Sequence, residues 1–202
     1  MKYYPVFLNL SNKRAVVVGG GKVAERKVRV LIKAGASVKV VSPYVTKYLE
    51  RLGKDGRIHH VKRSYRKGDL KDAFLVIAGT SSASTNEKIA RDARHLVNVI
   101  DTPTEGNFIA PSIVNRGALT IAISTGGSSP AVAKTIRKEL EKLYGSEFTH
   151  YLRVLEKIRR KIMREIQDGK QREKLLKKVA SEEIFNTIRK KGPSSLPELF
   201  SR

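Results

Sequence analysis

The sequence predicts an α/β protein with a doubly wound parallel sheet, followed by a short segment of different pattern and a C-terminal helical domain. A β-branched run, Ala15–Val18, is followed at once by three glycines, as at the end of a buried parallel strand. Apolar runs then alternate with amphipathic stretches as far as Asp101. After Gly145 the chain is basic and has helical periodicity. We therefore place the domains at residues 1–103, 104–145 and 146–202.

The first strand and its glycines form a dinucleotide fingerprint, Gly19-x-Gly21-x-x-Ala24. Gly19 allows the tight turn, Gly21 lets a pyrophosphate approach the backbone, and Ala24 lets helix and strand pack closely. The free N–H groups at the start of the helix, which is expected to run to about Ala34 before Gly35, would face the phosphates. Residues 1–103 are thus predicted to be a Rossmann-like NAD-binding domain in which Gly19, Gly21, Lys22 and Val23 contact the cofactor. A glycine-rich turn without a ligand is the alternative.

The second strand, Ser37–Val41, ends without the acidic residue that usually binds the ribose hydroxyls. The chain has Ser42, Pro43 and Tyr44 there, and we expect their backbone groups to take over that contact. The missing carboxylate leaves the choice between NAD and NADP open.

The elements that follow complete the predicted sheet. Thr80, after the fourth strand, is a further predicted cofactor contact. Ser84 and Glu87 have the spacing of a capping box. The predicted elements are a helix at 46–52, a strand at 57–62, a strand at 74–78, a helix at 84–94 and a strand at 96–100.

The pattern changes after Thr104. Two short strands, at 107–110 and 119–124, are predicted to pair in antiparallel fashion. A glycine-rich loop, Ser124–Pro130, then leads into a helix to about Leu143, with Ser129 as N-cap and Pro130 as its first residue. Such a helix start can bind an anion.

The C-terminal part carries an apolar stripe with Lys and Arg on the other face. Something must cover this stripe, so we predict a homodimer through the region after Gly145; solvation and ligand binding remain alternatives for the basic face. Shorter helices are expected at 170–179 and 181–190, and a loose tail from Gly192. The stripe consists of Leu152, Leu155, Ile158, Ile162 and Ile166.

The net charge of +22 implies an anionic partner, because a field of this size attracts polyanions. The sequence has no cysteine, which excludes disulfides and thiolate sites. His59, His60, His95 and His150 fall in no metal-ligand spacing, so no metal site is predicted. No apolar run is long enough to span a membrane and no signal peptide is recognised, so a cytoplasmic protein without membrane or nucleic-acid partners is expected.

Five motifs in order resemble the precorrin-2 dehydrogenase/sirohydrochlorin ferrochelatase family, the N-terminal part of siroheme synthases. They are YYPVFLNL near the start, VVVGGGKVAERK from Val16, NVIDTP from Asn98, FIAPSIVNRG from Phe108 and ISTGGSSP from Ile123.

The resemblance implies an enzyme that oxidises precorrin-2 to sirohydrochlorin with NAD; some members then insert ferrous iron. Family members are homodimers built on the region after the nucleotide fold, here residues 104–145. Asp101 matches the catalytic aspartate. Many members have two serines before the paired glycines, and Thr125 keeps the second hydroxyl. The predicted substrate-binding residues are Asn107, Arg116, Ser124, Thr125, Gly126, Gly127 and Ser128.

Asp101 also suits the chemistry. We place it at the carboxyl end of a central strand, where ligands bind in open α/β sheets. The oxidation releases a hydride to the nicotinamide and a proton to a base, and a carboxylate can take that proton, more readily if burial raises its pKa. The simpler interpretation is a turn residue before Thr102-Pro103.

Two other classes of function fit part of the sequence. An NAD-sensing regulatory module acting through its C-terminal helices explains the fingerprint but gives NVIDTP and STGGSSP no role. A nucleic-acid-binding protein explains the charge, but no recognised nucleic-acid motif accompanies it.

Overall fold

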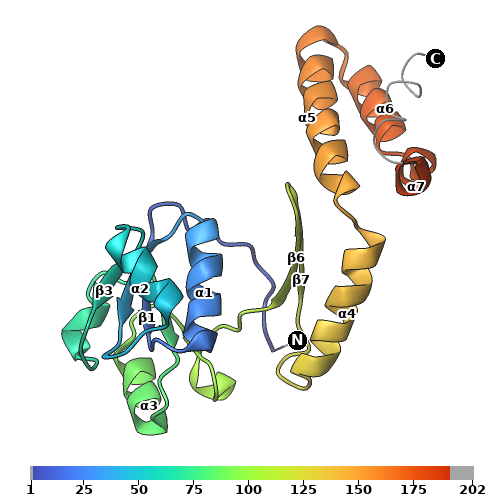
Figure 1. The fold of residues 1–202 in the computed structure, drawn as a ribbon. Helices are drawn as coiled ribbons and strands as arrows, with labels where there is room; N and C mark the ends of the chain where they lie inside the picture. The colour runs from blue at the N-terminus through green and yellow to red at the C-terminus, as the bar shows by residue number, and fades with distance from the viewer. Residues whose placement is uncertain (1, 192–202) are drawn as a thin grey trace. The chain divides into compact units, whose positions relative to one another are not determined.

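The computed structural model describes residues 2–191, and the chain divides into two compact units, Met1–Ala110 and Pro111–Arg202 (Figure 1). The first unit is the predicted α/β fold. The second contains an antiparallel strand pair and helices.

The first unit is built on a five-stranded parallel sheet with the order β3-β2-β1-β4-β5, which confirms the predicted doubly wound architecture. β1 lies in the centre, and Val18 at its end pairs with Val41 of β2 and with Ala78 of β4. The carboxyl ends of the strands therefore lie along one edge of the sheet. The strands are β1 (Arg14–Val18), β2 (Ser37–Val41), β3 (His59–Val61), β4 (Leu75–Ala78) and β5 (Leu96–Val99).

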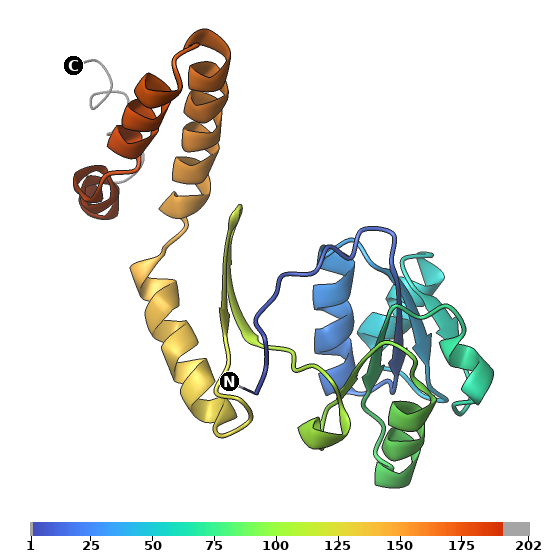
Figure 2. The same ribbon diagram turned by 180° about the vertical axis from the view of Figure 1, so that it is seen from behind.

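Both faces of this sheet are covered, which explains why the strands are apolar throughout. Ala15 and Val17 pack on one face with residues of α1 and α2, while Val16 and Val18 pack on the other face with Ile89 of α3. Figure 2 shows the same layers from behind. The helices are α1 (Lys22–Lys33), α2 (Lys47–Lys54) and α3 (Ala83–Asp92), with short 3₁₀ turns η1 (Lys67–Leu70) and η2 (Pro103–Glu105).

The predicted start of α3 and the predicted place of β5 in the sheet were wrong. The N-cap of α3 is Ser82, whose hydroxyl accepts a hydrogen bond from the N–H of Thr85, so the proposed capping box of Ser84 and Glu87 does not form. Ser82 is an equally suitable N-cap two residues earlier, and the spacing of Ser84 to Glu87 wrongly favoured the later start. β5 is an edge strand rather than a central one, because within residues 2–191 no further strand joins the sheet beyond it.

The segment predicted as a strand at 107–110 instead covers the free edge of β5. Asn107 exchanges two hydrogen bonds with Val97: its side-chain Oδ1 accepts from the Val97 N–H at 2.8 Å, and its own N–H donates to the Val97 carbonyl at 2.9 Å. Its Nδ2 donates to the carbonyl of His95 at 2.7 Å. A side chain thus takes the place of a sixth strand.

The second unit begins with an antiparallel pair of strands. Its first strand was predicted at residues 107–110 but lies later in the chain, at Ser112–Arg116. Its sheet pairs Val114 with Ile121, and α4 packs against both strands. The elements are β6 (Ser112–Arg116), β7 (Leu119–Ile123), α4 (Pro130–Leu143), α5 (Glu147–Glu165), α6 (Gly169–Val179) and α7 (Glu182–Lys191). The predicted tail from Gly192 lies outside the described residues.

An aromatic cluster joins the start of α5 to α7. The rings of Tyr144 and Phe148 lie 5.2 Å apart in an edge-to-face arrangement, and Phe148 lies 5.3 Å from Phe185. Leu152 and Leu155 of the predicted stripe pack into this cluster, and the remaining three stripe residues are half-buried. Part of the stripe is therefore covered within the chain, by α6 and α7.

None of the helices among residues 2–191 combines the length and apolar character that crossing a bilayer requires.

Candidate functional site

The glycine-rich turn after β1 is fixed by backbone neighbours on both sides. Gly19 has a φ of +124°, and a Cβ there would lie 2.2 Å from the carbonyl oxygen of Gly79. At Gly20 a Cβ would lie 2.0 Å from the carbonyl oxygen of Tyr44. Neither position can hold a side chain, so the middle glycine, to which the sequence pattern assigns no role, is as constrained as the first.

The start of α1 is open where a phosphate would bind. A Cβ at Gly21 would meet nothing within 4 Å, and this N-cap supplies no side-chain hydrogen bond to the first turn. By contrast, α2, α3, α4 and α6 each have a side-chain cap, whereas α5, like α1, has none. Ala24 is buried against the sheet, as the fingerprint requires. The first turn of α1 thus keeps the uncapped N–H groups and free space that a pyrophosphate needs.

The turn after β2 is closed by its own hydrogen bonds. The Ser42 hydroxyl donates to the carbonyl of Tyr44 at 2.7 Å, and the Ser42 carbonyl lies 3.0 Å from Nε2 of His60. The Ser42 side chain is buried and already engaged, while Pro43 and Tyr44 are exposed. That the backbone of Ser42–Tyr44 contacts the ribose stays a prediction.

The turn after β4 is held by Asn86, a residue that the sequence analysis missed. The Asn86 Oδ1 accepts hydrogen bonds from the N–H and the hydroxyl of Thr80, at 3.1 and 2.8 Å, and its Nδ2 donates to the Thr80 carbonyl at 3.1 Å. Asn86 is buried on α3. An asparagine inside a helix carries no signal of such a role in the sequence, because its partner lies in the preceding turn.

Asp101 follows β5 at the same edge of the sheet as Gly19, Ser42 and Thr80. The N–H of Ile100 still bonds to the carbonyl of Ala78, so the chain leaves the sheet at Asp101. Asp101 is exposed, so the fold by itself does not bury its carboxylate. Turns from four parallel strands therefore place the predicted cofactor contacts and the predicted base along one edge of the first unit.

The glycine-rich loop of the second unit is preorganised by its hydroxyl groups. The Ser124 hydroxyl accepts from the N–H of Gly126, and the Thr125 hydroxyl both donates to the carbonyl and accepts from the N–H of Ser129. Gly126 and Gly127 have φ of +64° and +96°, and added Cβ atoms there would meet nothing within 4 Å. The two glycines and Ser128 are exposed, beside the first turn of α4.

Arg116 has a structural role that the sequence analysis did not foresee. Its Nε donates to the carbonyl of Tyr144 at 2.8 Å and its Nη2 to that of Glu141 at 3.2 Å, at the C-terminal end of α4. Its Nη1 donates to the carbonyl of Asn115. The predicted substrate contact is thus already committed as a helix cap. The predicted contact Asn107 is likewise engaged along β5.

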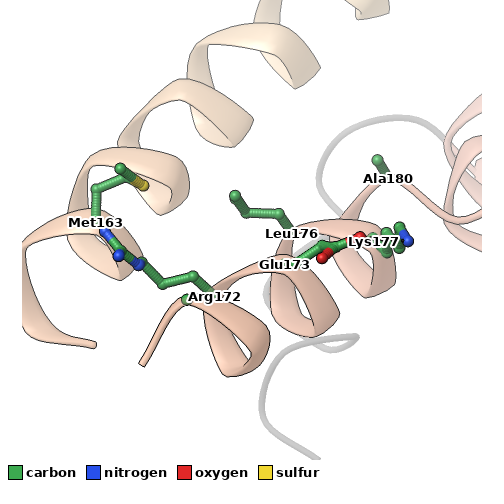
Figure 3. A pocket seen from close by; sticks show the side chains of 7 residues that line it. Met163, Arg172, Glu173, Leu176, Lys177 and Ala180 are labelled. Atoms are coloured by element: carbon green, nitrogen blue, oxygen red, sulfur yellow. Dashed lines mark ion pairs between the residues drawn. The ribbon is translucent and has the colours of Figure 1, made fainter. Parts of the chain in front are cut away.

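A hollow in the second unit contains none of the predicted site residues. It has a volume of about 530 Å³, and Figure 3 shows the side chains that line it, among them Met163 of α5 and Arg172, Glu173, Leu176 and Lys177 of α6. Lys177 is paired with Glu173 at 2.6 Å. No group of three potential metal ligands is found within residues 2–191.

The chain is similar to proteins of siroheme biosynthesis. Residues 6–112 match the family described as putative NAD(P)-binding, and residues 116–143 match the central part of the sirohaem biosynthesis protein. The siroheme synthase of Methylobacillus flagellatus is 36% identical over 93% of this chain and 40% of its own length. That of Nitrosococcus oceani is 38% identical over 92% and 41%. The chain thus spans about two fifths of these curated relatives.

Among solved structures, SirC, a precorrin-2 dehydrogenase, is similar over the whole chain. The TM-score is 0.84 at 26% identity, and the match covers 98% of each chain.

Proposed function

Because the chain belongs to the precorrin-2 dehydrogenase/sirohydrochlorin ferrochelatase family, we propose that it oxidises precorrin-2 to sirohydrochlorin with a nicotinamide cofactor. The observation that carries the proposal is the uncapped first turn of α1 behind an unobstructed Gly21, on the same sheet edge as Asp101. An NAD-sensing module would need the open first turn of α1 but not Asp101 at the same edge of the sheet.

The cofactor in this proposal is NAD. The first turn of α1, from Gly21 through Lys22 and Val23, holds the pyrophosphate, and the turn from Ser42 to Tyr44 holds the ribose. Thr80, locked by Asn86, borders the point where the connections from β1 and β4 leave in opposite directions, which is where ligands bind in such sheets. Bound NAD supplies the acceptor for the hydride.

Asp101 is the base in this proposal. Forming the new double bond requires a proton to leave the macrocycle along with the hydride, and an ionised carboxylate beside the ring accepts it.

The glycine-rich loop of the second unit is proposed to bind carboxylates of the tetrapyrrole. The exposed backbone at Gly126, Gly127 and Ser128 lies beside the first turn of α4, where anions are favoured. The net charge of +22 attracts the polyanionic substrate. Arg116 and Asn107 are left out of the proposed binding set because their side chains are already engaged.

Ferrous iron is proposed as a second substrate of the same site. Inserting a metal removes protons from pyrrole nitrogens, and Asp101 would accept them as it does in the oxidation. Cobalt insertion into sirohydrochlorin without NAD, lost in Asp101→Ala, tests this step.

The decisive experiment follows the absorbance of precorrin-2 with NAD and with NADP. Wild-type protein should form sirohydrochlorin, and Asp101→Asn should bind NAD normally while losing at least about 100-fold in kcat. The exposed Asp55→Asn serves as a control for removing one carboxylate from this unit. An Asp101→Asn protein with normal kcat contradicts the role of Asp101. A wild-type protein that binds NAD without oxidising precorrin-2 contradicts the proposed function.

A further inference from the structure

Lys27 on α1 is a half-buried lysine without a partner. Among the lysines of residues 2–187, whose side chains the structure describes, only Lys27 and Lys39 are not exposed. Lys39 is paired: its Nζ lies 3.0 Å from Oδ1 of Asp69 and donates to the Asp69 carbonyl. Lys27 makes no ion pair and no side-chain hydrogen bond with any residue in the described range.

The surroundings of Lys27 disfavour its charge. Burial lowers the pKa of its ammonium group, and the neighbouring positive charge of Arg26 lowers that pKa further. Both effects act against the charged form. A methionine or leucine at this border of the core would avoid this cost, so the fold itself gives no reason for a lysine. An unpaired charge retained beside a ligand site is a candidate for binding that ligand.

Lys27 lies on the flank of α1 that faces away from α2. Ala24, Val28 and Leu31 point into the core, and Glu25 faces α2 through its hydrogen bond with Thr46. At 100° per residue, Lys27 lies on the other side of the buried stripe from Glu25. Because α2 packs on β3 and the strand order is β3-β2-β1-β4-β5, this flank faces β4 and β5.

That flank adjoins the segment that carries the proposed base. Ile100 and Phe108, on either side of Asp101 and η2, pack into the same core as α1. Figures 1 and 2 both draw the short yellow-green helix η2 beside one end of α1. Helical side chains lean toward the N-terminus, and the long stem of a lysine can carry its amine toward the carboxyl edge of the sheet.

We propose that Lys27 binds a carboxylate of the tetrapyrrole substrate and thereby holds the macrocycle beside Asp101. This inference rests on the proposed function and adds one named contact to it. A carboxylate of the substrate would pair with the Lys27 ammonium group, for which the fold provides no negative partner. This ion pair would form where water is partly excluded. The pyrophosphate of the cofactor is not the partner, because the first-turn N–H groups already provide its site.

The test compares Lys27→Met and Lys27→Arg with Lys33→Met, an exposed lysine on the same helix. Lys27→Met should raise the KM for precorrin-2 about tenfold or more, and the Kd for sirohydrochlorin measured by absorbance titration likewise. Lys27→Arg should stay within about threefold of wild type, as should Lys33→Met. Calorimetry should give the same Kd for NAD in all four proteins.

Thermal unfolding without ligands separates binding from a structural role. Lys27→Met should leave Tm unchanged or raise it, because it removes an unpaired, partly buried charge. A lower Tm, an unchanged Kd for sirohydrochlorin or a weaker Kd for NAD each overturns the inference. The titration with sirohydrochlorin needs no turnover, so it judges Lys27 even if precorrin-2 oxidation by the wild-type protein fails.

Discussion

Gly19 and Gly79 approach so closely that the turns after β1 and β4 touch through their backbones, with no room for a Cβ between them. These are the strands at which the chain connections diverge to opposite faces of the sheet. The contact therefore sets the spacing between the two turns that border the proposed cofactor site.

Replacing Gly19 with alanine should destabilise the first unit. The new methyl group would meet the Gly79 carbonyl at 2.2 Å, and the backbone at φ +124° is unfavourable for any L side chain. Together these effects should cost about 3 kcal/mol. Urea denaturation followed by circular dichroism measures the loss, and wild-type stability would contradict the close contact.

Gly21→Asp should leave the fold intact but weaken the binding of the cofactor. The side chain would enter open space, and its negative charge would lie where the pyrophosphate is expected. We expect wild-type circular dichroism and at least about 100-fold weaker NAD binding by calorimetry. Gly21→Ala is the matched variant without the charge and should lose less affinity. Unchanged NAD affinity in Gly21→Asp would show that α1 does not bind the cofactor.

Asp69 should make stability depend on acid pH. Its carboxylate is 3% exposed and paired with Arg63 at 2.7 Å and with Lys39 at 3.0 Å. The hydrogen bond from Arg63 in particular holds the pKa of Asp69 well below its usual range, so the stabilisation is present above the unfolded value of about 3.9 and declines as the pH falls below it. Asp69→Asn should cost about 3 kcal/mol at pH 7.

The loss in Asp69→Asn should shrink as the pH falls below about 4, where the wild-type carboxylate itself begins to lose its advantage. Urea titrations at pH 7 and pH 3 measure the difference, with the exposed Asp55→Asn as control. A difference that is equal at both pH values would mean that Asp69 is not the titrating group.

Arg116→Ala should lower the stability of the second unit rather than weaken substrate binding. It removes three hydrogen bonds from one guanidinium, two of them to the last turn of α4. The expected cost is about 2 kcal/mol. Thermal unfolding should show it, with Arg159→Ala, an exposed residue of α5, close to wild type. If Arg116→Ala leaves Tm unchanged and raises the KM for precorrin-2, Arg116 binds the substrate as the sequence predicted.

A homodimer remains a prediction, and α4 offers it an apolar face. Val132, Ile136 and Leu143 are 49%, 37% and 45% exposed at helical spacing. Ile136→Glu should give a monomer by light scattering at micromolar concentration, while Met163→Glu, an exposed apolar residue of α5, should stay dimeric. The reverse result would move the interface to the region after Gly145.

The nucleotide-binding part of the fold was predictable because its signals are local. The run Ala15–Val18, the three glycines and Ala24 lie within ten residues and specify a strand, a turn and a helix together. The helices after Gly145 were found by periodicity alone, since each has an apolar side.

The features that the sequence did not predict depend on how the folded chain brings their partners together. That β5 forms an edge follows from the order of strands, and that Arg116 caps α4 follows from how β6 packs on that helix. Asn86 is similar: its importance comes from the backbone shape of Thr80, which no composition or spacing reveals. For Arg116, residue type predicted that the side chain would bind something, but not that the partner was the protein itself.

The amide of Asn107 along β5 has a consequence for how the protein behaves at high concentration. The unpaired N–H and C=O groups of an edge strand are a template on which another chain can add a strand, and this is a common start of aggregation. By bonding to Val97 and His95 through its side chain and to Val97 through its backbone N–H, Asn107 occupies part of that template. The protein can thus expose the edge of the sheet where the cofactor is proposed to bind while part of the β5 edge is closed to strand addition.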